Sequence, residues 1–316
     1  MVSQNLSFVN DYAVLTEACG LLDRSERGKL ALSGSGAKEF LHGQVTNDIE
    51  ALTPGSGCYA AFLTQKGKML GDLRVLDTGE ELLLDTERVA LQELFNLIRR
   101  FSIGYDAQLH KRTLESGLVS LLGPESARVA GVDDVPVEHA HAEITVAGIA
   151  ARAVGTDKGI DLLCDAADTS ALVRALEDRG ATPIAQDAAE CLRIESGRPR
   201  YGVDLDDTVI PQEAGLNDRA VSFTKGCYVG QETVARLFYR GKPNRHLRGL
   251  RADSPLTPGD AVRLEDRTVA TVTSAAVSPR LGAIALALVR REAPPGSRVS
   301  VGPDGIGASV VELPFG

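Results

Sequence analysis

The stretch from about His246 to the C-terminus constrains the fold most, because it alternates short β-like runs with turns. The turns include TPGD and PPGS, and the runs are HLRGLR, AVRLED, TVATVTSAAVS, GAIALALVRR, SRVSV and ASVVEL. Short strands separated by Gly- and Pro-containing turns are typical of a small antiparallel barrel or sandwich. We therefore predict a β domain over residues 246–316, with a boundary in the GKPNR stretch near residue 245.

Residues 1–245 combine strand and helix patterns, which indicates an α+β fold. KLALSG (29–34) predicts a strand that leads into the helical AKEFLHGQVTNDI, and Leu121, Leu122 and Gly123, followed by PESARVAG, repeat this order. This echo favours two related α+β units with a boundary near residue 115. Between them, AAFLTQKGKMLGDLRVLDTGEELLLDT predicts strands with Gly-containing turns, and TERVALQELFNLIRRF predicts an amphipathic helix capped by Thr86.

Four further elements are expected in the second half of this region. EITVAGIAARAV alternates like a strand pair, and GIDLLCD is typical of a buried strand. DTSALVRALEDRG predicts a helix that ends at Gly180. AQDAAECLRIESG predicts another helix, closed by Gly197 and followed by Pro199.

The composition argues against several classes of protein. The chain of 316 residues has a formal net charge of −9, whereas binding to nucleic-acid backbones needs clustered positive charge. MVSQNLSFVNDYAVL lacks the basic flank and apolar run of a signal peptide, and the longest apolar runs fall far below the roughly 18 residues that span a bilayer. We therefore expect a cytoplasmic protein that binds neither nucleic acid nor membrane.

One of the five cysteines has an unusual context. The cysteines are scattered without a CxxC pair, which argues against a metal cage and favours a reducing compartment. Cys227 lies in KGCYVGQE, two residues after Lys225 and just before a helix predicted to begin near Gln231. A nearby cation and a helix N-terminus both raise the fraction of thiolate. The motif therefore predicts an activated thiol; the alternative, a small buried core residue, is what we expect for Cys19, Cys58, Cys164 and Cys191.

KGCYVGQE resembles the signature of YgfZ-type folate-binding proteins, which are relatives of the glycine-cleavage T-protein (aminomethyltransferase) family. KLALSGSGAKEFLHGQVTNDI, FLTQKGKMLGDLRV, CLRIESGRPRYGVDLDDTVIPQEAGL and KGCYVGQETVARLFYRGKPNRHLRGL resemble successive blocks of that family in the expected order. The resemblance implies an α+β fold with three lobes in a ring around a channel, the last lobe being a C-terminal antiparallel β-barrel domain. It also implies a monomer that binds tetrahydrofolate and supports iron–sulfur cluster assembly or repair in client proteins.

The resemblance further assigns the ligand-binding residues. Glu195 aligns with the glutamate that binds the pterin in T-proteins, and a carboxylate matches the two adjacent N–H donors of a pterin; the alternative for Glu195 is a solvated helix end. Arg236 and Arg240 are candidates for the folate tail, whose carboxylates favour arginine, and their alternative is an ordinary surface role. The remaining candidates come from the motif itself: Tyr228, Gly230, Gln231 and Glu232.

One departure from the T-protein pattern concerns the acid that assists one-carbon transfer. T-proteins carry an acidic pair after the Gly-rich turn, whereas this chain has Gly71-Asp72. T-proteins also lack a cysteine at the position of Cys227. The loss of one acid and the gain of a thiol indicate altered or absent transfer chemistry, and the alternative for Asp72 is a solvated strand residue.

We rank three functions on this basis. The first is a folate-binding accessory protein for iron–sulfur enzymes, in which Cys227 is the reactive thiol, aided by Lys225, and Glu195 binds the pterin. The second is an active folate-dependent transferase or demethylase with Asp72 as its key acid. The third is a non-catalytic interaction module with a vestigial pocket.

Overall fold

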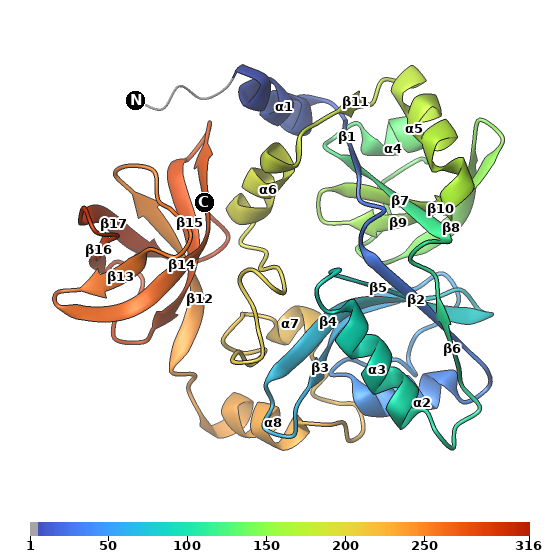
Figure 1. Cartoon of the computed structure of the whole chain (residues 1–316), viewed down its shortest axis with the longest axis horizontal. Coiled ribbons are helices and arrows are strands. Elements are labelled where there is room, and N and C mark those ends of the chain that lie inside the picture. Colours follow the sequence, from blue (N-terminus) through green and yellow to red (C-terminus); the bar gives the residue numbers. More distant parts are fainter. Residues whose placement is uncertain (1–5) are drawn as a thin grey trace. The chain divides into compact units, whose positions relative to one another are not determined.

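In the computed structural model, which describes residues 6–316, the first of two sheets in the N-terminal region has five strands. Their order is β3-β4-β5-β2-β6, and the assigned pairs of β2, β4 and β5 are antiparallel. The bounds are β2 Gly28–Ser33, β3 Gly57–Leu63, β4 Met69–Asp77, β5 Glu81–Thr86 and β6 Gln108–Lys111. Helices α2 (Ala37–Gln44) and α3 (Leu91–Phe101) pack on this sheet (Figure 1).

The second sheet has six strands in the order β11-β1-β7-β10-β9-β8. Its core includes Leu121, Ile160, Leu162, Leu172 and Leu176, all fully buried. Helices α4 (Ser126–Ala130) and α5 (Thr169–Asp178) contact it, and α1 (Leu6–Glu17) contacts β1. The strand bounds are β1 Gly20–Asp23, β7 Ser116–Leu122, β8 His141–Val146, β9 Ile149–Thr156, β10 Gly159–Asp165 and β11 Thr182–Pro183; a short 3-10 turn, η1, spans Ala166–Asp168.

The strand–glycine–helix order seen twice in the sequence has the same local geometry in both sheets. Gly34 follows β2 with φ 107°, and Gly123 follows β7 with φ 114°. In each case an added Cβ would lie within 2.5 Å of a backbone oxygen, of Asp106 and Ala18 respectively. Only glycine tolerates both the positive φ and this approach.

Two predicted details of the first sheet were wrong. Thr86 does not cap a helix: it is the last residue of β5, its hydroxyl donates a hydrogen bond of 2.6 Å to the Asp72 carbonyl, and α3 begins only at Leu91. The helix expected after residue 36 is also shorter than predicted, because Val45 is extended (φ −115°, ψ 163°) and α2 ends at Gln44. Thr46 and Asn47 do not continue the helix, and their side chains donate hydrogen bonds to the carbonyls of Ala220 and Tyr59.

The C-terminal strands form a closed antiparallel barrel in the order β12-β15-β14-β13-β16-β17. Alternating small and branched side chains fill it, among them Val262, Val272, Ala285, Ala287 and Val310. The predicted α+β fold with a C-terminal antiparallel barrel is therefore confirmed. The bounds are β12 Arg245–Ala252, β13 Ala261–Leu264, β14 Arg267–Ser278, β15 Gly282–Arg290, β16 Arg298–Val301 and β17 Ile306–Val311.

The chain separates into two compact units. Unit 1 comprises Met1–Leu63, Leu70–Ala189 and Arg219–Val229, and unit 2 comprises Thr64–Met69, Glu190–Asp218 and Gly230–Gly316. Both sheets belong to unit 1 and the barrel to unit 2. The remaining helices are α6 (Gln186–Glu195), α7 (Asn217–Ala220) and α8 (Gln231–Arg240). The division of residues 1–245 near residue 115 and the boundary at 245 both remain predictions; β12 begins at Arg245.

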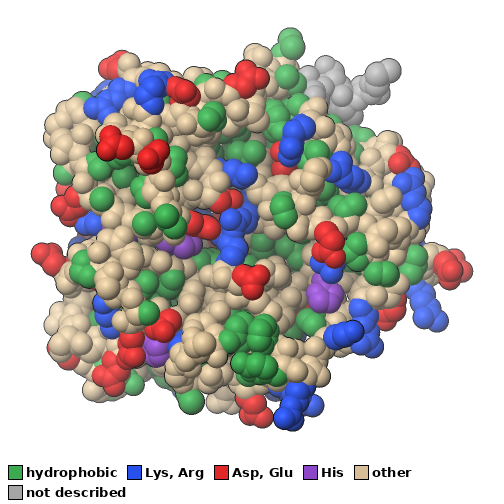
Figure 2. All heavy atoms as spheres, turned by 180° about the vertical axis from the view of Figure 1, so that it is seen from behind, with side chains coloured by type: hydrophobic (Ala, Val, Ile, Leu, Met, Phe, Trp, Pro, Cys, Tyr) green, Lys and Arg blue, Asp and Glu red, His purple; other side chains and the backbone are tan. Residues whose placement is uncertain are grey.

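Two surface properties bear on the partners that the chain can take. Among residues 6–316, no helix has the length and apolar character needed to cross a bilayer. The face drawn in Figure 2 carries acidic and basic side chains interspersed with one another. The location of the protein and its oligomeric state remain predictions.

Candidate functional site

Asp72 lies on the inner face of the five-stranded sheet, beside Tyr59. Neighbouring residues of a strand point to opposite faces, and Gly71 faces α3: a Cβ on Gly71 would come within 3.0 Å of Leu94. Asp72 therefore points away from this helix. The Tyr59 hydroxyl of β3 donates a hydrogen bond of 2.5 Å to Asp72 Oδ2, and Asp72 is only 6% exposed. The predicted solvated alternative for Asp72 does not describe this position.

The surroundings of Asp72 favour its protonated form. Burial raises the pKa of Asp72 to about 6, against a lowering by the Tyr59 hydrogen bond and a further rise from the Glu87 carboxylate. Burial and the Asp72 carboxylate raise the pKa of Tyr59 well above its usual value. A carboxyl group that titrates near neutral pH can both accept and donate a proton, which is what general acid–base catalysis requires.

A layer of buried charges connects the two sheets of unit 1 beside this pair. Arg74, two residues after Asp72 on β4, contacts Asp85 of β5 at 3.0 Å and Asp161 of β10 at 2.8 Å. Arg27 contacts the other oxygen of Asp85 at 2.8 Å, and Ser120 of β7 donates to Asp161 at 2.6 Å. Burial raises the pKa of Asp85, but the two arginines outweigh it and lower the pKa to about 2.

Lys225 of the KGCYVGQE motif is held inside unit 1. Its ammonium group donates to the carbonyls of His42, of Val45 at 2.8 Å and of Asn47 at 3.1 Å, at the end of α2. It also lies 5.0 Å from the centre of the buried Tyr228 ring. Burial lowers the pKa of Lys225 to about 8. This lysine therefore anchors the motif to the chain segment that follows α2.

The thiols of the chain differ in exposure. Cys227 is exposed, whereas Cys19, Cys164 and Cys191 are buried and Cys58 is half-buried. Burial raises the pKa of Cys58 to about 12, against a lowering by the Lys225 ammonium group. The predicted core positions of Cys19, Cys164 and Cys191 are in agreement with their burial.

Replacing Lys225 with methionine is expected to destabilise the protein by about 2 kcal/mol, because one buried and two part-buried carbonyl acceptors lose their donor. Methionine keeps the length and apolar stem of lysine without its charge. Urea denaturation followed by circular dichroism measures the change, and Lys66→Met, at an exposed turn position, is the control. An unchanged denaturation midpoint for Lys225→Met would show that the ammonium group contributes no anchoring.

Glu195 lies in unit 2 at the end of α6 and is not solvated. It is 4% exposed, the Ser278 hydroxyl donates to Oε1, and Arg280 Nη2 lies 3.3 Å from Oε2. A carboxylate accepts up to about four hydrogen bonds, so ligand N–H groups can add to these partners or replace them. The position suits a carboxylate that binds paired donors.

Helix α8, also in unit 2, carries the remaining motif residues. Gly230 is its left-handed N-cap (φ 85°), Gln231 is half-buried, and Glu232 lies exposed in the first turn. Arg236 and Arg240 are one helical turn apart and exposed, so they lie on the same side of the helix. Among residues 6–316, neither guanidinium group has a hydrogen-bond or ion-pair partner. They are available to bind an anion.

Comparison with known proteins assigns both parts of the chain to one family. A model described as the GCVT N-terminal domain matches residues 5–225, and a model described as the glycine cleavage T-protein C-terminal barrel domain matches residues 245–315. The chain belongs to the glycine cleavage T-protein family. The superfamily part of the resemblance seen in the sequence is therefore confirmed.

Individual members of the T-protein family agree with this assignment over nearly the whole chain. An aminomethyltransferase of Rubrobacter xylanophilus is 31% identical over 315 residues, which cover 96% of this chain and 84% of that protein. A putative chloroplastic transferase of Arabidopsis thaliana is 28% identical over 308 residues, covering 93% and 71%. The crystal structure of the glycine cleavage system aminomethyltransferase T from Bartonella henselae shares the fold, with a TM-score of 0.87, 24% identity and coverage of 98% and 89%.

These T-protein relatives bear on the ranking of functions made from the sequence. They are named as transferases, which agrees with the second hypothesis better than with the accessory role in iron–sulfur assembly that we ranked first. The YgfZ subtype, the folate ligand and the iron–sulfur partners stay predictions. So do the roles assigned to Asp72, Lys225, Cys227, Glu195 and the α8 residues.

The sequence analysis missed Tyr59 and the charge layer. A usable signal was present in MLGDLRVLD, where Asp72 and Arg74 stand two residues apart within an otherwise apolar strand. Such spacing puts both side chains on one face of a buried strand, where charges need partners. The identities of those partners, Tyr59, Asp85 and Asp161, could not be read from the spacing.

Proposed function

We propose that the chain binds a reduced folate and transfers a one-carbon unit between the folate and an aminomethyl donor, with Asp72 as the acid–base group. The hydrogen bond between Tyr59 and Asp72, in a site where burial raises the carboxyl pKa to about 6, is the observation that carries this proposal. The 31% identity to an aminomethyltransferase supports it.

The residues present fit tetrahydrofolate. Its pterin offers N–H donors, for which Glu195 provides a buried carboxylate. Its tail ends in carboxylates, for which the two exposed guanidinium groups of α8, on Arg236 and Arg240, provide partners. Tetrahydrofolate supplies the nitrogen atoms that carry the one-carbon unit.

The chain contributes proton transfer and orientation. Tyr59 occupies Asp72 Oδ2, so Oδ1 is the oxygen at which the carboxyl group exchanges a proton. The Tyr59 hydroxyl keeps the carboxyl plane fixed, and the Thr86 hydroxyl, bonded to the Asp72 carbonyl, holds the strand beneath it. Burial excludes water, which strengthens both interactions.

Position 71, where this chain has glycine in place of a second acid, lies on the opposite face of the sheet from Asp72. Gly71 points toward Leu94 of α3, where a carboxylate would lie in an apolar layer at a cost of several kcal/mol, by order of magnitude. Asp72 alone reaches the side of the sheet that carries Tyr59 and Arg74. The single acid is therefore compatible with transfer.

A second candidate function follows from the exposure of Cys227. An exposed thiol between two glycines suits contact with a partner protein or with an iron–sulfur cluster in transit. In this accessory role folate would bind without being a substrate, and Cys227 would be the essential residue in place of Asp72.

The experiment compares the two candidates in one purified protein. Calorimetric titration measures tetrahydrofolate binding, and ammonia release from an aminomethyl donor, together with methylene-tetrahydrofolate formation, measures transfer. Cys227→Ser is expected to keep kcat within about twofold, because this thiol takes no part in the proton transfer assigned to Asp72. No turnover with any donor, combined with loss of iron–sulfur enzyme activities in cells carrying Cys227→Ser, would favour the accessory role and overturn the transferase.

A further inference from the structure

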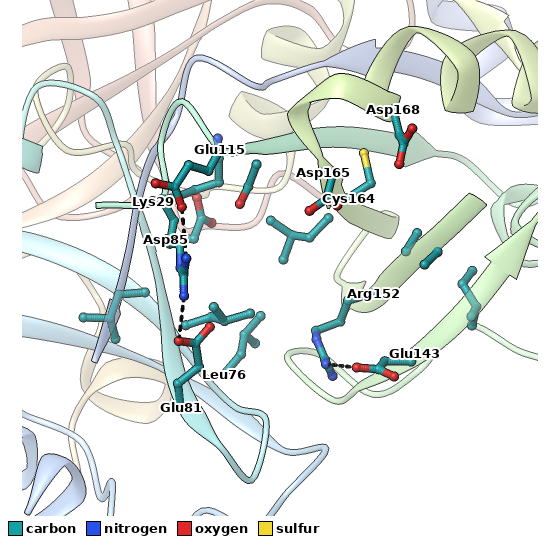
Figure 3. A pocket seen from close by; sticks show the side chains of 18 of the residues that line it. Lys29, Leu76, Glu81, Asp85, Glu115, Glu143, Arg152, Cys164, Asp165 and Asp168 are labelled. Atoms are coloured by element: carbon teal, nitrogen blue, oxygen red, sulfur yellow. Dashed lines mark hydrogen bonds and ion pairs between the residues drawn. The ribbon is translucent and has the colours of Figure 1, made fainter. Parts of the chain in front are cut away.

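A cavity of about 640 Å³ lies between the two sheets of unit 1. Its walls come from β2, β4 and β5 on one side and from β8, β9 and β10 on the other (Figure 3). A volume of this size lies within the range of roughly 300–1,000 Å³ that is usual for small-molecule sites. The functions discussed above assign no ligand to it.

Half-buried hydrophobic side chains form part of both walls. Leu83 of β5 faces the cavity from the first sheet, and Ile144 of β8 and Leu163 of β10 face it from the second. Because all three are half-buried, part of their apolar surface is exposed to water. A ligand with an aliphatic chain would remove this surface from water, which favours binding.

Acidic residues outnumber basic residues by six to three among those that line the cavity. The basic groups are all engaged. Arg112 contacts Glu115 at 2.9 Å and Glu81 at 3.2 Å, and Arg152 contacts Glu143 at 2.6 Å. The Lys29 ammonium donates to the Ser25 carbonyl at 2.8 Å and to the Arg27 carbonyl at 3.1 Å. An anionic ligand would therefore have to compete with these partners.

The excess negative charge lies in two groups. In the first, two carboxylates, those of Glu81 and Glu115, share the single guanidinium of Arg112. In the second, Asp165 and Asp168 are exposed, and within residues 6–316 neither carboxylate has a hydrogen-bond or ion-pair partner. Figure 3 shows these aspartates across the cavity from Glu81, whereas the backbone of Glu115 lies beside Asp165, since the Ala166 N–H donates to the Glu115 carbonyl at 2.9 Å.

We propose that this cavity binds a linear aliphatic diamine or polyamine. One ammonium group pairs with Asp165 and Asp168, a second pairs with the carboxylates around Arg112, and the alkyl chain packs on Leu83, Ile144 and Leu163. A monoamine would satisfy one end only, and a bare divalent cation would leave the apolar walls exposed. The site is separate from Asp72 and goes beyond the proposed transfer function.

The test is calorimetric titration of the full chain with spermidine and with cadaverine, using butylamine, magnesium and citrate as comparison ligands. Both polyvalent amines are expected to bind, at least tenfold more tightly than butylamine. Asp165→Asn combined with Asp168→Asn is expected to weaken spermidine binding at least tenfold. The matched control, Glu177→Gln with Asp178→Asn, removes the same charge from exposed positions of α5 outside the cavity and is expected to change binding less than twofold.

A second variant tests the carboxylates around Arg112 and keeps the proposal falsifiable if the first is poorly folded. Arg112→Gln releases Glu81 and Glu115, so it is expected to tighten spermidine binding severalfold. The proposal is overturned if spermidine and cadaverine do not bind, or if magnesium binds equally well at the same residues. It is also overturned if citrate binds and Arg112→Gln abolishes that binding, since the cavity would then be an anion site. Failure of tetrahydrofolate binding, in contrast, would leave these results unaffected.

Discussion

Replacing Arg74 with methionine is expected to destabilise the protein by about 3–5 kcal/mol, since removal of one partner leaves buried charges uncompensated. Arg74 is 7% exposed and is the link between Asp85 of the first sheet and Asp161 of the second. Asp85 would keep its ion pair with Arg27, whereas Asp161 would lose its ion pair and keep the hydrogen bond of the Ser120 hydroxyl. Urea denaturation monitored by circular dichroism measures the loss.

Two comparisons make the Arg74 prediction specific. Arg128→Met removes an ion pair between side chains that are 60% and 44% exposed, and it should cost less than about 1 kcal/mol. Arg74→Met combined with Asp161→Leu removes both buried charges, so it should recover much of the lost stability. If Arg74→Met were no more destabilising than Arg128→Met, the charge layer would not hold the two sheets together.

Replacing Asp72 with asparagine is expected to lower kcat for one-carbon transfer by about 10²- to 10⁴-fold, the usual contribution of a general acid–base group. Asparagine can still accept the hydrogen bond of Tyr59, so the geometry is kept while proton exchange is lost. Tetrahydrofolate affinity should change far less than kcat. The control is Asp77→Asn, at a buried carboxyl of the same strand that pairs with Lys38 at 2.6 Å. Equal losses of kcat in both variants would point to a general effect on the strand.

The same Asp72 substitution should stabilise the fold at neutral pH. The folded-state pKa of Asp72 is raised to about 6 from 3.8, so the folded protein binds this proton more tightly than the unfolded chain. Asp72 therefore contributes most to the stability of the fold below pH 3.8, and this contribution is lost as the pH rises through 6. Asp72→Asn should be more stable than the parent protein by about 3 kcal/mol near pH 7.5 and by little near pH 4. A gain that is equal at both pH values would be due to packing and not to the charge.

The KGCYVGQE motif shows which features can be predicted from neighbouring residues and which cannot. The sequence correctly indicated a helix from Gln231, because glycines and helix periodicity are local properties. It paired Lys225 with Cys227 because they are neighbours in the chain. In the fold the ammonium group of Lys225 binds the carbonyls after α2, about 180 residues away in sequence, and no local pattern encodes such a contact.

The Gly71-Asp72 pair shows the same division. Counting acids along the chain suggested that transfer chemistry was weakened. The structure assigns the two positions to opposite faces, one against Leu94 and the other beside Tyr59. Strand alternation could have predicted that they differ, but which face carries the charges depends on what packs against each.

The sequence by itself determined the strand and helix order, the C-terminal antiparallel barrel and the family, because periodicity, turn residues and ordered motifs are written in neighbouring residues. Only the tertiary structure decided which charges meet between the sheets, where Lys225 is bound and that a cavity with acidic residues in its lining lies between the two sheets. Those features arise when residues far apart in the chain are brought together and lose water, and the free energy of such contacts depends on partners that no single segment contains.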